Sequence, residues 1–88
     1  MIPESRKEGL ITQEVGDELV IYDERTNAAH RLNRPAAMVW RLADGKRSTK
    51  ELAKLLHDTL DAPEDTDLVD AALAELDKSG LLAARLPK

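Results

Sequence analysis

The stretch that most constrains the fold spans residues 27–47, NAAHRLNRPAAMVWRLADGKR, in which a short strand pattern leads directly into an apolar helix pattern. Asn33 suits the N-cap of that helix, because its side chain can accept a hydrogen bond from a first-turn N–H group. Pro35 fits the first turn, where its missing N–H costs nothing, and Gly45 fits the C-terminal stop. This stretch therefore separates a strand-forming half of the chain from a helix-forming half.

The first half predicts a meander of three strands. Leu10–Val15 alternates, with one face made by its odd-numbered residues, and a tight turn at residues 16–17 leads into Glu18–Asp23, an apolar run too short for a helix. A second turn, at residues 23–27, precedes the third strand, Ala28–Leu32. The small side chains at the start of this third strand leave its backbone approachable, so we expect an open sheet edge there.

The second half predicts three helices, because its apolar residues recur at spacings of three and four. The first covers residues 34–43, the second begins at a capping box of Ser48 and Glu51 and ends near residue 62, and the third covers residues 64–79 before Gly80. The expected inward residues are Ala36, Val39, Trp40 and Ala43; Leu52, Leu55, Leu56 and Leu60; and Leu68, Val69, Ala72, Leu73 and Leu76. The predicted fold is an α+β domain, winged helix-turn-helix-like, with a three-stranded antiparallel sheet followed by three helices.

The length of 88 residues predicts one domain. Residues 1–8 are polar and aperiodic, so we expect a flexible N-terminal tail, with the domain over residues 9–86. The chain has no cysteine for disulfides or thiolate metal sites. It also lacks a membrane-length apolar run or a signal-peptide core, which predicts a cytoplasmic protein without a membrane partner. Because a chain this short buries only a small core, self-association into a homodimer is also compatible with the sequence.

The charge distribution argues against a nucleic-acid partner. The net charge is −4, and Trp40 and Tyr22 are the only aromatic residues, whereas nucleic-acid binding favours basic surfaces and stacking platforms. In a helix-turn-helix protein the second helix of the motif enters the DNA groove. Here that helix is the third one, with several acidic residues and only Lys78 as a base. A winged-helix DNA-binding regulator is therefore the weaker alternative.

The sequence offers few candidates for catalysis or metal binding. His30 and His57 are the residues suited to proton transfer near neutral pH, but they fall on different elements without a catalytic motif or ligand spacing. The acidic residues between positions 58 and 70 lack the glycine of a calcium loop. We therefore expect no enzyme activity, no cofactor and no metal. The basic strip of Lys46, Arg47, Lys50 and Lys54 is expected to be solvated, with contact to an acidic partner as the alternative reading.

Several short motifs follow one another in a family-like order. They are Asp23-Glu24 at a turn, Leu32-Asn33, Val39-Trp40, Asp44-Gly45, Glu51-Leu52, and Leu76 followed by Gly80-Leu81-Leu82. In this order, over about residues 10–82, the chain resembles the PqqD family, whose members recognise leader peptides in ribosomal peptide biosynthesis. The resemblance implies a non-catalytic module that captures the leader of a precursor peptide. It would present that leader to a modifying enzyme, such as a radical SAM enzyme or a leader peptidase, in a PQQ, lasso-peptide or related pathway.

The resemblance also implies where the leader binds: as a strand beside the third strand, in the groove between that strand and the third helix. An open edge supports such strand addition. The residues carried over are Ala28, Ala29, His30, Arg31 and Leu32 on the strand, and Val69, Ala72, Leu73 and Leu76 on the helix, some of which must be core. Arg31, Arg34 and Lys78 are expected to meet leader carboxylates.

Overall fold

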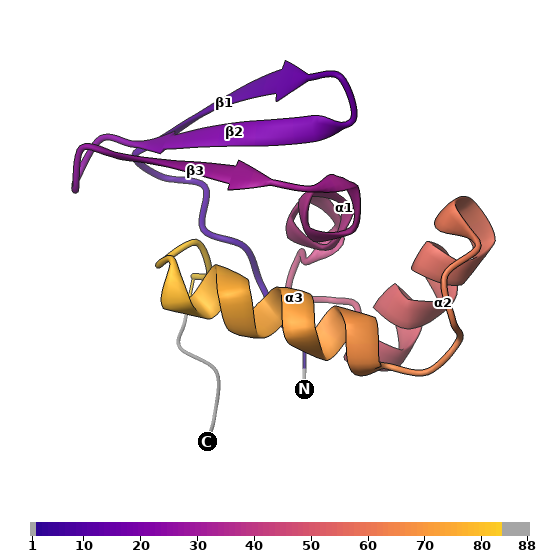
Figure 1. Ribbon diagram of the computed structural model, residues 1–88. Helices are drawn as coiled ribbons and strands as arrows, with labels where there is room; N and C mark the ends of the chain where they lie inside the picture. The colour runs from indigo at the N-terminus through magenta and orange to yellow at the C-terminus, as the bar shows by residue number, and fades with distance from the viewer. Residues whose placement is uncertain (1, 84–88) are drawn as a thin grey trace.

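The computed structural model describes residues 2–83. Its elements, in chain order, are β1 (Leu10–Val15), β2 (Glu18–Asp23), β3 (Ala28–Leu32), α1 (Arg34–Leu42), α2 (Thr49–Leu60) and α3 (Asp67–Lys78). The three strands form one antiparallel sheet with β2 in the centre. Figure 1 shows α1 and α3 on one side of the sheet and α2 farther from it. The predicted α+β class, a three-stranded antiparallel sheet followed by three helices, is confirmed.

The two hairpin turns use residues that tolerate the left-handed backbone conformation. Gly16 has a φ of 62° between β1 and β2, and Asn27 has a φ of 57° between β2 and β3. Glycine adopts such angles without strain, and asparagine is among the side chains that tolerate them best. The two-residue turn pairs Val15 with Glu18 and so sets the register of the first hairpin.

Side-chain caps fix where α1 and α2 begin. The Asn33 carboxamide accepts a hydrogen bond from the Ala36 N–H (3.0 Å), and Ser48 and Glu51 form the predicted capping box of α2. The third helix begins at Asp67, three residues later than predicted. In the turn before it, the Asp65 carboxylate accepts a hydrogen bond from the Asp67 N–H (3.1 Å), which satisfies that group outside the helix.

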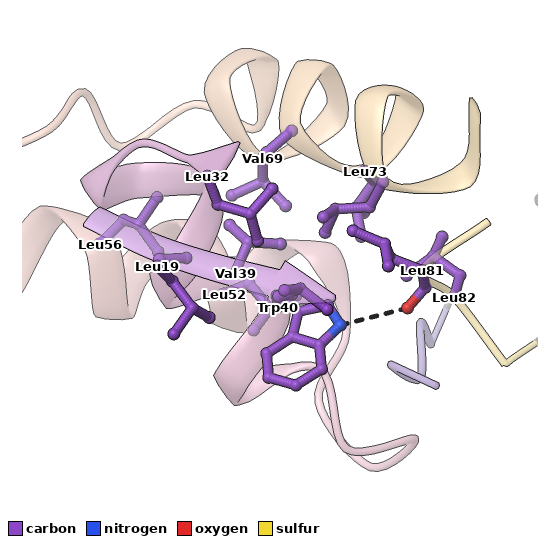
Figure 2. Close-up of a cluster of buried hydrophobic side chains, with 14 of the residues drawn as sticks. Leu19, Leu32, Val39, Trp40, Leu52, Leu56, Val69, Leu73, Leu81 and Leu82 are labelled. Atoms are coloured by element: carbon purple, nitrogen blue, oxygen red, sulfur yellow. Dashed lines mark hydrogen bonds between the residues drawn. The ribbon is translucent and has the colours of Figure 1, made fainter. Parts of the chain in front are cut away.

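One hydrophobic core joins the inner face of the sheet to all three helices (Figure 2). Trp40 is only 6% exposed, and its Nε1–H donates a hydrogen bond to the Leu81 carbonyl (3.2 Å). The expectation that Trp40 is a core residue is therefore confirmed. On α2, Leu52 and Leu56 are fully buried, whereas the other two predicted inward leucines are half-buried.

The N-terminal segment differs from the predicted flexible tail. Residues 3–6, here called the N-terminal strap, lie against the end of α1 and the segment after α3. The Ser5 N–H donates to the Ala43 carbonyl (2.7 Å), the Ser5 hydroxyl donates to the Trp40 carbonyl, and the Arg6 N–H donates to the Leu81 carbonyl (2.9 Å). These carbonyls need partners because they lie at or beyond helix ends. The packed domain therefore starts near residue 3, while residues 84–86 of the predicted domain lie outside the described residues.

Arg6 also anchors the strap to the sheet through an ion pair. Its guanidinium donates to both carboxylate oxygens of Asp23 (2.8 and 3.1 Å), and Asp23 is 2% exposed. These hydrogen bonds from Arg6, helped by the Arg25 N–H, lower the pKa of Asp23 from 3.8 to about 2. The ionised carboxylate is thus favoured in the folded state.

We expect this ion pair to make stability depend on acidity. Because the pKa of Asp23 is lower in the folded chain, its stabilisation is present above about pH 4 and is lost as the pH falls towards 2. Urea unfolding at pH 6 and pH 2.5 should show a loss of unfolding free energy at the lower pH, and Asp23→Asn should show a smaller loss. Equal losses in both proteins would contradict this role for Asp23.

Candidate functional site

The strand β3 leaves one edge of the sheet open, and the register shows which of its backbone groups face outward. The Glu24 N–H donates to the Gly9 carbonyl (2.9 Å), continuing the β1–β2 ladder, so the even-numbered residues of β2 bond to β1. Because successive residues of an antiparallel strand point their N–H and C=O groups to opposite neighbours, the odd-numbered ones bond to β3. Their partners are Ala28, His30 and Leu32. The N–H and C=O groups of Ala29 and Arg31 therefore face the open edge.

A groove separates this edge from α3. No Cα atom of α3 lies within 8 Å of a Cα atom of β3. One part of the groove has a volume of about 390 Å³ and is lined by Ala29, His30, Arg31, Leu32, Asn33, Ala36, Glu75 and Ser79. A second part has a volume of about 170 Å³ and is lined by Asn33, Pro35, Ala36, Leu68, Ala71, Ala72 and Glu75. The shared residues make the two parts continuous, and we call them together the β3–α3 groove.

The two parts of the groove differ in chemistry. The smaller part is mostly apolar, and its alanines leave room beside Pro35 and Leu68 for a larger apolar side chain. The larger part adjoins the outward backbone groups of β3 and contains polar side chains. One of them is His30, whose Nε2 is buried without a hydrogen-bond partner among the described residues. The groove can thus accept an extended chain that offers backbone groups to one wall and an apolar side chain to the other.

The structure brings only some of the predicted site residues into the groove. On β3, four of the five predicted residues line it, Ala28 being the exception. On α3 only Ala72 does, because Val69, Leu73 and Leu76 are at most 1% exposed and belong to the core. Figure 2 shows Val69 and Leu73 within that core. These three residues therefore pack inside the domain and do not line the groove.

Sequence reasoning missed the residues that replace them. The α3 wall is made by Leu68, Ala71 and Glu75, together with the C-cap residue Ser79. The start of α1 contributes its N-cap Asn33, Pro35 and Ala36. The α3 residues lie one helical position to the side of the buried stripe, at the same spacings of three and four. That spacing was the signal available in the sequence.

The three expected basic contacts do not converge on the groove. The Arg31 guanidinium is held by the Glu18 carboxylate, with Nε and a terminal nitrogen at 2.7 and 2.6 Å. Arg34 instead lines a separate hollow of about 280 Å³ beside Met38 and Leu60. Lys78 is exposed at the end of α3 and is not among the residues that line the groove.

The second histidine closes the turn between α2 and α3. Nδ1 of His57 lies 2.7 Å from the Ala62 carbonyl, and Nε2 lies 3.4 Å from Glu64. The Ala62 carbonyl, followed by nearby carboxylates, raises the pKa of His57. These contacts favour the protonated ring and hold the turn between α2 and α3 together. His57 does not line the groove that contains His30.

Residues 2–83 contain neither a cluster of metal ligands nor a membrane-spanning helix. No group of three or more His, Cys, Asp or Glu side chains there is arranged to hold a metal ion. No helix in that part of the chain combines the length and apolar character needed to cross a membrane.

The protein is thus a small α+β domain with a groove between the open β3 edge and α3. The chain belongs to the PqqD family, described as coenzyme PQQ synthesis protein D, which matches residues 18–82. The matched region runs from the start of β2 to just beyond α3 and so includes both walls of the groove. The family predicted from the motifs is confirmed.

A solved structure has the same fold. It is described as TbiB1 in complex with the TbiA(beta) leader peptide, and it matches with a TM-score of 0.72 over 92% of this chain and 96% of that chain. The two sequences are 17% identical, so the likeness establishes the fold. No curated protein matches the chain.

Proposed function

We propose that this protein is a peptide-binding module without catalytic activity of its own. It captures the leader of a ribosomally made precursor peptide as an added strand on β3 and presents it to a modifying enzyme. The observation that carries the proposal is the outward direction of the Ala29 and Arg31 backbone groups, on an edge strand that faces a groove. Membership of the PqqD family and the fold shared with a leader-peptide complex support it.

In strand addition the two walls of the groove have different roles, because β3 bonds to the peptide backbone and the α3 side receives peptide side chains. A peptide placed about 4.8 Å from β3 forms ladder hydrogen bonds with the outward N–H and C=O groups of Ala29 and Arg31. These bonds give affinity with little dependence on the peptide sequence, whereas pockets for alternate side chains give specificity. The apolar part of the groove, beside Leu68 and Ala72, is such a pocket.

The partner that receives the bound leader is a modifying enzyme of a PQQ, lasso-peptide or related pathway, such as a radical SAM enzyme or a leader peptidase. We place this capture in the cytoplasm, where ribosomal precursor peptides are made. The DNA-binding alternative is not favoured by any contact described above, because the exposed surface of α3 carries Asp67, Asp70 and Glu75. Such acids repel phosphates.

The proposal is tested by NMR titration with synthetic leader segments of short precursor peptides encoded beside the gene. We expect amide shift changes and slower hydrogen exchange at Ala29 and Arg31. The matched control is the other open edge of the sheet, where the register turns Thr12 and Glu14 outward from β1. Protection on β1 instead of β3, or no binding of any segment, would contradict the proposal.

A further inference from the structure

The β3–α3 groove contains one carboxylate that has no cation beside it. We infer, on the basis of the proposed function, that the bound leader places a lysine or arginine against Glu75, adjacent to the apolar residue in the smaller part of the groove. Glu75 is then a specificity-determining residue, and the substrate class is a leader with a basic residue in its docking segment.

The position of Glu75 is the first step towards this inference. Glu75 lines both parts of the groove, so it lies where the apolar pocket meets the polar part along β3. Glu75 is exposed, and its backbone carbonyl accepts a hydrogen bond from the Ser79 N–H (3.0 Å), whereas its carboxylate has no hydrogen-bond partner among the described residues. No basic side chain among the described residues forms an ion pair with it.

The other charged side chain of the groove is already engaged. Arg31 lies on β3 with its guanidinium bound to Glu18, which pairs with it across the outer face of the sheet. Besides Glu75, Arg31 and His30, the lining residues have uncharged side chains. The groove therefore offers a peptide one uncompensated negative charge, opposite to the expectation that basic residues attract an acidic leader.

An added strand would present side chains to this carboxylate in a regular way. Alternate side chains of a strand point to one face of the sheet, so those on the helix side face α3. A cation there gains an exposed ion pair, which is modest in energy, whereas an acidic residue at the same position meets a like charge. The main effect of Glu75 is thus to reject leaders that carry an acid at this position.

The experiment is a selection of random peptides displayed on phage against the wild-type protein and two charge-reversed variants. The wild type should enrich peptides with Lys or Arg at one fixed position, and Glu75→Lys should enrich Asp or Glu at that position. The control is Asp58→Lys, which makes the same charge change on the exposed surface of α2, outside the groove. It should select the same peptides as the wild type.

Binding of the selected peptides is then measured after the charges of the peptide residue and of residue 75 are exchanged. Replacing the enriched Lys by Glu should weaken binding to the wild type by about three- to ten-fold, and Glu75→Lys should restore it. Peptides that protect the Ala29 and Arg31 amides without any charge preference would overturn this inference and leave the proposed function standing. If no peptide binds to the folded protein, the proposed function fails, and the inference fails with it.

Discussion

Replacing Arg31 by proline should weaken leader binding roughly 10- to 100-fold while the domain stays folded. Proline has no N–H, and at Arg31 the lost group faces the open edge of the sheet, where it would bond to the peptide rather than to β2. The peptide carbonyl that loses this donor would be left unsatisfied. Calorimetric titration with the leader segment measures the affinity, and circular dichroism checks the fold.

Two further variants make this result specific. Arg31→Ala keeps the N–H and removes only an exposed ion pair with Glu18, so binding should change by less than about three-fold. His30→Pro removes an N–H that faces β2, so it should damage the sheet itself and show as lost circular dichroism signal. A folded Arg31→Pro protein that binds the leader normally would rule out strand addition on β3.

Replacing Trp40 by alanine should lower the free energy of unfolding by roughly 3–5 kcal/mol, as is usual when a large buried side chain is truncated. Trp40 is 6% exposed, bonds to the Leu81 carbonyl, and carries the Lys7 ammonium 4.0 Å above its ring. Small domains are stable by only about 5–15 kcal/mol, so the variant would be partly unfolded at room temperature if the wild type lies at the low end. Urea unfolding followed by circular dichroism measures the change.

The matched variant is Trp40→Phe. It keeps most of the buried aromatic volume but removes the N–H, so the Leu81 carbonyl loses a buried donor. We expect a loss of about 1–3 kcal/mol, clearly smaller than for alanine. A loss below about 1 kcal/mol for Trp40→Ala would mean that the indole contributes little to the core, against its observed burial.

The elements that sequence reasoning placed well are those fixed by local signals. Asn33 and the Ser48–Glu51 box start helices through contacts within three residues, and Gly16 and Asn27 occupy turns that need their backbone freedom. On β3, alternation separates buried Leu32 from exposed Arg31. Such features need no knowledge of distant parts of the chain. On β1 the alternating pattern does not produce a buried face, because every residue after Leu10 is exposed.

The features that could not be predicted from the sequence depend on contacts between residues far apart in the chain. Nothing local distinguishes Ser5 from a solvated serine, because its burial comes from Ala43 and Trp40. Apolar residues cover two adjacent faces of α3, so periodicity alone could not separate buried Leu73 from groove-lining Leu68. Glu75 was overlooked because a charged residue on a helix is ordinarily just solvated.

The N-terminal strap has a consequence for how the chain folds as it is synthesised. The β1–β2 and β2–β3 hairpins and the helix caps need only nearby residues, so they can form early on the ribosome. The strap, however, donates a hydrogen bond to the Leu81 carbonyl. The Trp40 indole donates to the same carbonyl, which lies 41 residues after Trp40 in the chain. A nascent chain that stops short of Leu81 therefore keeps an unclosed core, and the domain is completed only when its last core residues emerge.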